Sequence, residues 1–453
     1  MKKLLFIFLL CLILILLITC SSVDSPAFTD GDLEEAETNL PKSNFFGLVD
    51  YDNKHADGTF DEADYQRSGK SYTYTAEDIS GSELESIINS KISSGNTIIL
   101  DGSKGKFSLN LTKIRKSYIT IRGINNAILD FSATYGSITK EDIAQAVEGV
   151  RSQAASGKGH YLSTYDSELN KKLEQGRGLY ITGSYNIIED LIIENAADNG
   201  LLIGQNGNYN IVRNVEARFC GDAGIQISGT ALKTPVDCSE DYEEGGPHHN
   251  MFFNCYSHNN FDPWNLGENA DGFAVKGGAG DYNYFENCIA EYNADDGWDC
   301  YRIRGSTTWV NCQANYNGLC QATGENWAEY SNGNGFKVGG GAKSGTFNGQ
   351  TVNSPEKHPH AQYLKGCSAK GNRGNSGVGF DRNNQYGAIY LEDCFATDNH
   401  ASILADGRTS LRHQDYALGS YGAKCYVKNC FIGSINDVVE SAYAGLIRVK
   451  ASE

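Results

Sequence analysis

Residues 287–293, Asn-Cys-Ile-Ala-Glu-Tyr-Asn, recur at residues 311–317 as Asn-Cys-Gln-Ala-Asn-Tyr-Asn. The same frame, a cysteine with an asparagine five residues later, returns at Cys255, Cys367 and Cys394. The shortest repeat distances are 24 or 25 residues, which suits one coil of two or three short strands separated by bends. The sequence therefore predicts an all-β, right-handed parallel β-helix, whose coils bury their apolar residues by stacking ~4.8 Å apart.

Stacking aligns equivalent residues of successive coils, so the repeated asparagines are expected to form a ladder of hydrogen-bonded amides at a buried bend. This ladder is structural rather than catalytic. The repeated cysteines lie in apolar runs, where a thiol behaves as a small hydrophobic side chain. We expect them to stack in the core; disulfides between Cys425 and Cys430, or Cys238 and Cys320, are the alternative.

A glycine that leads an apolar strand follows the repeats, and the segment before it varies in length. Gly297 lies four residues after the repeated asparagine of its coil, but Gly272 lies 12 residues and Gly335 lies 18 residues after theirs. Long loops are therefore expected on one face of the solenoid, where they wall a cleft. Aromatic residues of these loops can stack on sugar rings, with simple packing as the alternative: Trp264, Trp327 and Tyr330.

The ends of the solenoid also have sequence signals. A capping helix is predicted over residues 82–92, because Ser82 and Glu85 fit a capping box before an apolar face. The first strand is expected at 97–100. Residues 139–175 break the repeat with a helix-like pattern and are expected to form an excursion outside the coils, which resume at Leu179.

The N-terminal segment predicts export. Lys2 and Lys3 precede an apolar run over residues 4–18, which is short for a membrane span and typical of a secretory signal. The residues around Cys20 resemble a bacterial lipoprotein signal, with plain secretion as the alternative. We expect a signal peptide at 1–20, a tether and extension at 21–75, and a catalytic β-helix at 76–453. The predicted protein is a bacterial monomer, secreted or held at the outer membrane through its lipid alone.

Composition narrows the range of partners. The 453 residues contain 38 Lys and Arg against 56 Asp and Glu, a formal net charge of −18. A nucleic-acid-binding groove needs clustered cations, so this class of partner is not expected.

Alignment of the coils on the glycines predicts a cluster of four carboxylates. Asp271 and Asp296 lie one residue before a glycine, with Asp295 beside them, and Asp299 lies two residues after one. Grouped carboxylates repel one another unless a cation neutralises them. An all-oxygen ligand set without phosphate favours Ca²⁺ over Mg²⁺. The column of Asp299 also contains Lys337.

Other charged residues near this cluster are candidates for substrate binding. Arg302 and Arg304 alternate along a strand and can clamp carboxylates of a ligand, although solvated strand charges are an equal interpretation. Lys276 lies in a coil of the acidic column and is a third candidate. The histidines at 248, 249, 358 and 360 fit no strong zinc template.

Three segments resemble the signature of the pectate lyases of polysaccharide lyase family 9. They are Ala-Asp-Gly-Phe-Ala-Val-Lys at 270–276, Asn-Ala-Asp-Asp-Gly-Trp-Asp at 293–299 and Asn-Gly-Phe-Lys at 334–337. The resemblance covers roughly residues 178–399. It implies that Asp271, Asp295, Asp296 and Asp299 bind calcium, and that Lys337 is the catalytic base.

The resemblance implies cleavage of polygalacturonate, the main chain of pectin, by β-elimination. Loss of the C5 proton next to the uronate carboxylate is followed by loss of the C4 oxygen, and calcium on that carboxylate stabilises the developing charge. A lysine of reference pKa ~10.4 can serve as the base if burial or the cation lowers its pKa. The alternatives are a β-helical glycoside hydrolase and a non-catalytic carbohydrate-binding or adhesin solenoid.

Overall fold

The structure is a computed structural model that describes residues 60–229, 246–301, 305–319, 330–339, 361–383 and 388–401, together with short segments at 346–347, 350–351, 415–418, 425–428, 430–432 and 446–449. The predicted signal peptide, most of the predicted tether, Arg302, Arg304, Trp327, His358, His360, Cys238 and Cys320 lie outside these ranges. None of the helices within them is long and apolar enough to span a membrane.

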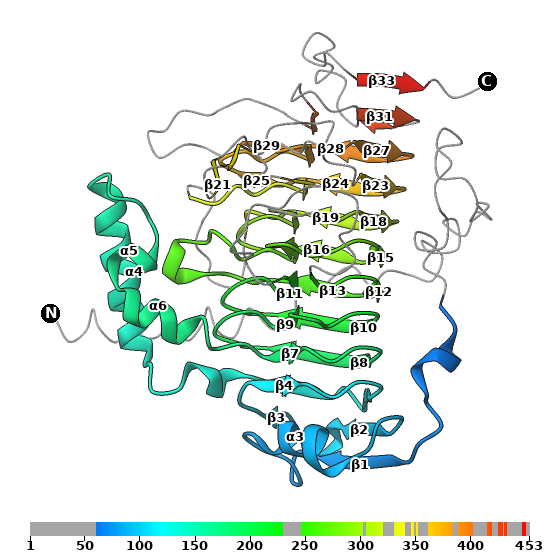
Figure 1. Cartoon of the computed structure of the whole chain (residues 1–453). Helices are drawn as coiled ribbons and strands as arrows, with labels where there is room; N and C mark the ends of the chain where they lie inside the picture. Colours follow the sequence, from blue (N-terminus) through cyan, green and yellow to red (C-terminus); the bar gives the residue numbers. More distant parts are fainter. Residues whose placement is uncertain are drawn as a thin grey trace, which may run out of the picture. The chain divides into compact units, whose positions relative to one another are not determined.

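The described residues form a right-handed parallel β-helix, as the repeat predicts (Figure 1). Each complete coil passes through three faces, and each strand pairs in parallel with the equivalent strand of the next coil. The first face comprises β1 (Ser71–Thr75), β2 (Thr97–Asp101), β5 (Thr120–Ile124), β8 (Ile187–Glu194), β10 (Ile211–Arg218), β12 (Met251–Phe253), β15 (Asn283–Glu286), β18 (Thr307–Val310), β23 (Gln362–Lys365), β27 (Ile389–Glu392), β31 (Cys425–Lys428) and β33 (Leu446–Val449).

The second face begins with two short strands and continues through the second halves of β8 and β10. Its separate strands are β3 (Phe107–Ser108), β6 (Ile128–Asp130), β13 (Tyr256–His258), β16 (Ile289–Glu291), β19 (Gln313–Asn315), β24 (Ser368–Lys370), β28 (Phe395–Thr397) and β32 (Phe431–Ile432).

The third face is a separate sheet, and it carries the predicted acidic column. It comprises β4 (Thr112–Ile114), β7 (Leu179–Ile181), β9 (Leu201–Gly204), β11 (Ile225–Ser228), β14 (Phe273–Lys276), β17 (Trp298–Asp299), β20 (Phe336–Lys337), β26 (Phe380–Asp381) and β30 (Tyr416–Ala417). Two smaller pairings lie outside these faces: β21 (Thr346–Phe347) with β22 (Gln350–Thr351), which is antiparallel, and β25 (Arg373–Gly374) with β29 (His400–Ala401).

The predicted asparagine ladder is confirmed at the bend between the second and third faces. The side-chain amide of Asn260 donates to Oδ1 of Asn293 at 2.8 Å, and Asn293 donates to Asn317 at 2.9 Å. The same oxygens accept the backbone N–H groups of the preceding coil. The landmark glycines make room for the ladder, since a Cβ at Gly297 would lie 2.7 Å from Nδ2 of Asn317. The ladder and the glycines are therefore one structural feature.

A second ladder of buried amides precedes the first face, and the sequence prediction missed it. It runs through Asn186, Asn210, Asn250 and Asn283, whose Oδ1 atoms accept backbone N–H groups of the coil before. An aromatic residue comes just before each of these asparagines. The spacing between its members is 24, 40 and 33 residues, so the insertions between coils conceal its period.

The core contains the predicted stack of thiols beside a stack of rings. The cysteines that follow the first-face strands from β10 to β27 are fully buried: Cys220, Cys255, Cys288, Cys312, Cys367 and Cys394. Cys425 and Cys430 do not form the alternative disulfide with each other. On the inner side of the third face, Phe273 stacks on Trp298 at 4.1 Å, and Trp298 on Phe336 at 5.6 Å. This continuous core holds the outward residues of the third face in register.

The N-terminal end is closed by the predicted helix, which is only partly α-helical. α3 (Glu83–Ser86) continues as the π-helical turn η2 (Ile87–Lys91), and Leu84, Ile87 and Ile88 are buried against the first coils. The Ser82 side chain makes no capping bond. The predicted pairing with Glu85 is therefore wrong, because Glu85 instead accepts the backbone N–H of Lys113 and pairs with Arg115.

The first paired strand also comes earlier than predicted. β1 pairs with β2 along its whole length, so the coils begin at Ser71 and not at residue 97. The sequence of β1, Ser-Tyr-Thr-Tyr-Thr, alternates tyrosines with hydroxyl residues but contains no aliphatic residue, so its strand signal is weaker than that of residues 97–100. The remaining short helices are η1 (Glu62–Tyr65), η3 (Gly102–Lys104), η4 (Ser132–Tyr135) and η5 (Pro263–Asn265).

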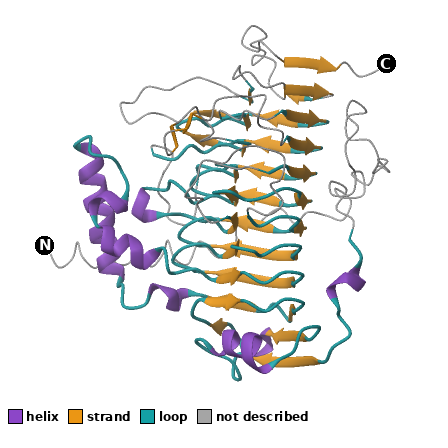
Figure 2. Cartoon of the chain, viewed as in Figure 1, coloured by secondary structure: helices purple, strands orange, loops and turns teal. Residues whose placement is uncertain are grey.

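The predicted excursion is confirmed as a helical segment outside the coils (Figure 2). It contains α4 (Lys140–Ala155), α5 (Leu162–Tyr165) and α6 (Ser167–Leu173). Thr139 and Asp142 form a capping box at the start of α4. A second apolar cluster joins the excursion to the loop around η5, which leads directly to the acidic column.

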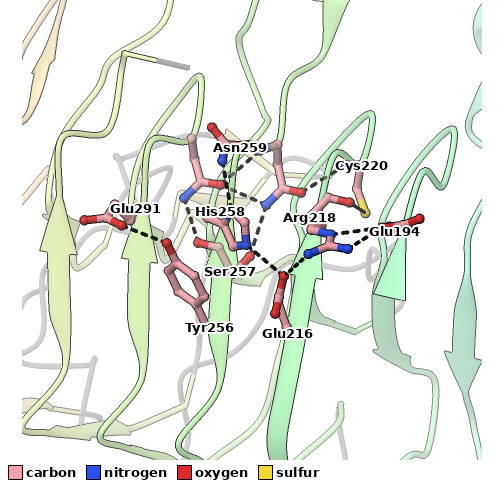
Figure 3. A network of polar contacts seen from close by, with 11 residues as sticks. Glu194, Glu216, Arg218, Cys220, Tyr256, Ser257, His258, Asn259 and Glu291 are labelled. Atoms are coloured by element: carbon pink, nitrogen blue, oxygen red, sulfur yellow. Dashed lines mark hydrogen bonds and ion pairs between the residues drawn. The ribbon is translucent and has the colours of Figure 1, made fainter. Parts of the chain in front are cut away.

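The outer side of the second face carries a chain of charged contacts (Figure 3). Arg218 donates to Glu194 at 2.7 Å and to Glu216 at 2.6 Å, and His258 lies 3.1 Å from Glu216. Glu194 and Glu216 each have a basic partner, and Glu291 accepts the Tyr256 hydroxyl at 2.7 Å. These contacts therefore stabilise the packing of neighbouring coils and do not indicate a ligand site.

Candidate active site

The site lies on the third face, at the bend that the asparagine ladder shapes. Asp271 and Asp296 occupy equivalent positions in neighbouring coils, since the N–H of Gly272 donates to the Asp296 carbonyl. Asp299 pairs in register with Lys337 of the next coil. The parallel register therefore brings together residues that span coils β14, β17 and β20, as the sequence predicts.

Three of the four predicted aspartates form a tight group. One carboxylate oxygen from each of Asp271, Asp296 and Asp299 lies within 4.8 Å of the others. All three residues are buried. We call these three residues the Asp triad.

Asp295 is buried beside the Asp triad, but its carboxylate accepts hydrogen bonds from backbone N–H groups. Its Oδ2 accepts the backbone N–H of Asn269 at 2.9 Å, and its Oδ1 accepts that of Asn332 at 2.7 Å. These amides belong to the loops that lead to Asp271 and to Lys337. Asp295 thus ties the two loops together.

Two lysines contact the Asp triad from opposite neighbouring coils. Lys276 Nζ lies 2.6 Å from Asp271 Oδ2 and 2.9 Å from Asp299 Oδ2. Lys337 Nζ lies 3.0 Å from Asp296 Oδ2 and 3.3 Å from Asp299 Oδ1. Lys276, predicted as a substrate-binding residue, is therefore also part of the carboxylate cluster.

The electrostatics of the cluster follow from burial and charge together. Burial raises the pKa of Asp271 and Asp296 well above the ordinary value, and the neighbouring aspartates add to this. Burial acts on Asp299 in the same direction, but Lys276 and Lys337 outweigh it, and the pKa of Asp299 is lowered.

The pKa of Lys337 is raised, whereas a lysine that acts as a base needs a lowered pKa. Burial favours its neutral amine, but Asp296 and Asp299 outweigh burial and raise the pKa of Lys337 well above its ordinary value. Of the two causes that could lower the pKa of Lys337, burial is therefore not sufficient among these protein groups. A base at this position requires neutralisation of the carboxylates around it.

The residues present fit a hard divalent cation. Asp296 Oδ2 and Asp299 Oδ1 are buried and accept no hydrogen bond, although Lys337 lies within ion-pair distance of both. Four buried carboxyl groups exceed the two lysine charges. Oxygen donors of this kind suit calcium, so the Asp triad is the part of the described chain that could hold such an ion.

Part of this chain is similar in sequence to proteins named pectate lyase L. The pectate lyase L of Paenibacillus polymyxa is 40% identical over 169 residues, which cover 36% of this chain and 35% of that protein. The pectate lyase L of Dickeya chrysanthemi is 26% identical over 236 residues, 52% of this chain and 47% of that protein. The matched regions thus span less than half of these relatives.

A solved structure, pectate lyase Pel9A, superposes with a TM-score of 0.53 at 18% identity and covers 84% of this chain and 78% of that one. Residues 83–409 match the family described as "Pel9A-like, right handed beta helix region". This match extends over most of the chain and includes every residue of the Asp triad and both lysines. The chain belongs to the Pel9A-like right-handed β-helix family.

Proposed function

We propose that this protein is a calcium-dependent pectate lyase that cleaves polygalacturonate by β-elimination. The observation that carries the proposal is the buried Asp triad with Lys337 in contact with two of its carboxylates. The similarity to proteins named pectate lyase L supports the choice of substrate. Polygalacturonate is anionic, and a cation between two sets of carboxylates would allow this acidic protein to bind it.

In the proposed reaction, Lys337 Nζ takes the C5 proton of a galacturonate unit. The electrons of the C–H bond form the C4–C5 double bond, and the bond from C4 to the glycosidic oxygen breaks. The departing oxygen takes a proton from solvent. Asp271, Asp296 and Asp299 would hold the calcium, with Asp295 beside them. When bound, calcium would stabilise the enolate-like charge on the uronate carboxylate.

The remaining predicted residues have proposed roles in substrate binding. Lys276 contacts Asp271 and Asp299 and has a raised pKa, because these carboxylates outweigh its burial. It therefore offers a fixed positive charge to a uronate carboxylate. Arg302 and Arg304 follow Asp299 in the sequence and are proposed to clamp a neighbouring uronate unit.

A glycoside hydrolase mechanism fits this arrangement less well. It needs two carboxyl groups on opposite sides of the scissile bond, ~5.5 Å or ~6.5–9.5 Å apart. The triad oxygens instead lie within 4.8 Å of one another, and both lysines contact them. A purely adhesive solenoid would not require a buried lysine among aspartates.

The test is incubation of the purified protein with polygalacturonate and calcium, with the absorbance of the unsaturated product as the measurement. We expect product to accumulate, to stop after exhaustive chelation and to resume when calcium is restored. New reducing ends without an unsaturated product would establish a hydrolase instead. Full activity after chelation would contradict the calcium requirement.

A further inference from the structure

The helical excursion is attached to the loop that leads to Asp271. The backbone N–H of Leu162 donates to Asn265 Oδ1 at 2.9 Å, and the Tyr161 hydroxyl donates to Glu268 Oε1 at 3.0 Å. His160 Nε2 contacts the other oxygen of Glu268. Figure 1 shows α4 and α5 beside the coils at this level. The start of α5 is therefore fixed beside the active-site bend.

Apolar packing makes this attachment rigid. Val150 and Leu162 of the excursion belong to one buried cluster with Trp264 and Leu266 of the loop, and Ala270, next to Asp271, is in the same cluster. The ring of His160 also lies 5.4 Å from the ring of Tyr330, in the loop that leads to Lys337. The excursion thus contacts both loops that Asp295 ties together.

Two tyrosines near this junction have unusually exposed rings. Tyr161 is 38% exposed and Tyr301 is 40% exposed, among the highest values for large hydrophobic residues of the described chain. The Tyr161 ring is held by stacking on His160 at 4.5 Å, in addition to the bond from its hydroxyl. Such a fixed and exposed ring is a preorganised surface for a ligand.

Both tyrosines lie close to the acidic cluster. Tyr301 follows Asp299 by two residues, and its carbonyl accepts the N–H of Gly277, next to Lys276. Burial, followed by the charges of Glu268, Asp295 and Tyr301, raises the pKa of Tyr161 to about 12. Tyr161 comes from a different part of the chain and reaches the cluster through Glu268, whose neighbour Asn269 donates its backbone N–H to Asp295 at 2.9 Å.

We propose that Tyr161 and Tyr301 form an aromatic sugar-binding subsite beside the Asp triad, which takes a pyranose ring of the polyuronide. This proposal rests on the proposed function, since it assumes that the polyuronide lies across the Asp triad. The rings offer apolar surface to the C–H face of a sugar. The Glu268 carboxylate beside Tyr161 would repel a carboxylate of the ligand. We therefore expect hydroxyl groups of the sugar, and not its carboxylate, to lie at this position.

The kinetic test replaces each ring separately. Tyr161→Ala and Tyr301→Ala should each raise KM for polygalacturonate roughly 3- to 10-fold and leave kcat within about twofold, because each removes stacking that is the same in ground and transition states. Tyr165→Ala is the matched control, since Tyr165 lies in the same excursion and is 46% exposed. An equal rise in KM for Tyr165→Ala would assign the effect to docking of the excursion and overturn the subsite.

The binding test does not depend on turnover. In a Lys337→Ala background, calorimetry with tetragalacturonate and calcium should show ~3- to 10-fold weaker binding after Tyr161→Ala or Tyr301→Ala. Tyr161→Phe keeps the ring and should bind within about twofold of the Lys337→Ala parent. Thermal unfolding checks that each variant is folded.

The two failures are distinguishable. A wild-type protein that never produces unsaturated product refutes the lyase proposal, and calorimetry then still tests the subsite. A wild-type protein that cleaves polygalacturonate, while both alanine variants keep KM and affinity within about twofold, refutes the subsite alone.

Discussion

At the residue scale, the position of Lys337 is defined by two carboxylates. Its Nζ lies 3.0 Å from Asp296 and 3.3 Å from Asp299, and these groups keep its pKa high. A proton acceptor at this place therefore depends on the charge balance of the Asp triad. The same contacts hold the amine in one position, which is what a general base requires.

Lys337→Arg should lower kcat by ~10²–10⁴, because the guanidinium keeps the positive charge but stays protonated. The measurement is the rate of unsaturated product formation at saturating polygalacturonate and calcium. The control is Lys106→Arg, at an exposed lysine paired with Glu194, which should keep wild-type turnover. In the wild type, the rate should rise toward alkaline pH, since the raised pKa of Lys337 leaves the amine protonated at lower pH. An arginine variant with near wild-type kcat would contradict the assignment of the base.

Calcium should raise Tm, and by more at pH 8 than at pH 5. The raised pKa values of Asp271 and Asp296 mean that protons compete with calcium for these carboxylates as pH falls. A ligand that binds the folded state stabilises it by mass action. Differential scanning calorimetry with and without calcium measures the shift.

The same experiment has matched variants. Asp296→Asn should abolish the calcium-induced rise in Tm, while Asp190→Asn, at a partly exposed aspartate of β8, should keep it. A calcium shift that survives Asp296→Asn unchanged would place the ion elsewhere.

At the element scale, each coil depends on its neighbours through the ladder amides. Asn293 accepts from the side chain and the backbone of Asn260, and its own amide donates to Asn317 and to the Ser257 carbonyl. Removal of one ladder side chain therefore leaves several buried polar groups without partners. A buried polar group without a partner destabilises the folded state by more than a typical hydrogen bond stabilises it.

Asn293→Ala should destabilise the protein by roughly 2–4 kcal/mol, since each buried group left without a partner costs ~1–3 kcal/mol. Urea unfolding followed by circular dichroism measures this change. Asn315→Ala is the control in the next coil, because Asn315 is partly exposed and its amide contacts only the neighbouring Gln313 side chain among the bonds described. Equal stability of the Asn293 variant and the wild type would show that the ladder is dispensable.

At the scale of the whole solenoid, the core is continuous from the capping helix through the stacked coils. The N-terminal end of such a stack exposes apolar residues unless it is covered. Leu84, Ile87 and Ile88 supply this cover. The cap therefore controls solubility and stability rather than chemistry.

Ile88→Asp should produce an aggregated or strongly destabilised protein, because it places a charge in the fully buried first layer of the core. Size-exclusion chromatography and thermal unfolding measure the two outcomes. Lys91→Asp, at an exposed position of the same turn, should remain monodisperse with a Tm close to that of the wild type. A monodisperse Ile88→Asp protein of wild-type Tm would contradict the capping role.

Much of this architecture was predictable because a solenoid converts sequence period directly into spatial alignment. The Cys-x4-Asn frame determined the coil, the stacked thiols and one amide ladder. Alignment of the sequence on the glycines is enough to place Asp271, Asp296, Asp299 and Lys337 together. In each case the contact joins neighbouring coils, so its geometry follows from the repeat alone.

Tertiary structure decided what the repeat does not encode. The second ladder has irregular spacing, and β1 contains no aliphatic residue, so the sequence signal of each is weak. The role of Asp295 depends on backbone N–H groups of two loops, and Tyr161 reaches the site through contacts more than 100 residues distant in sequence. Likewise, the pKa of Lys337 is raised because the fold brings carboxylates close enough to outweigh the effect of burial. Loop conformation and electrostatics depend on the positions of many groups at once, and a local pattern of residue types does not contain them.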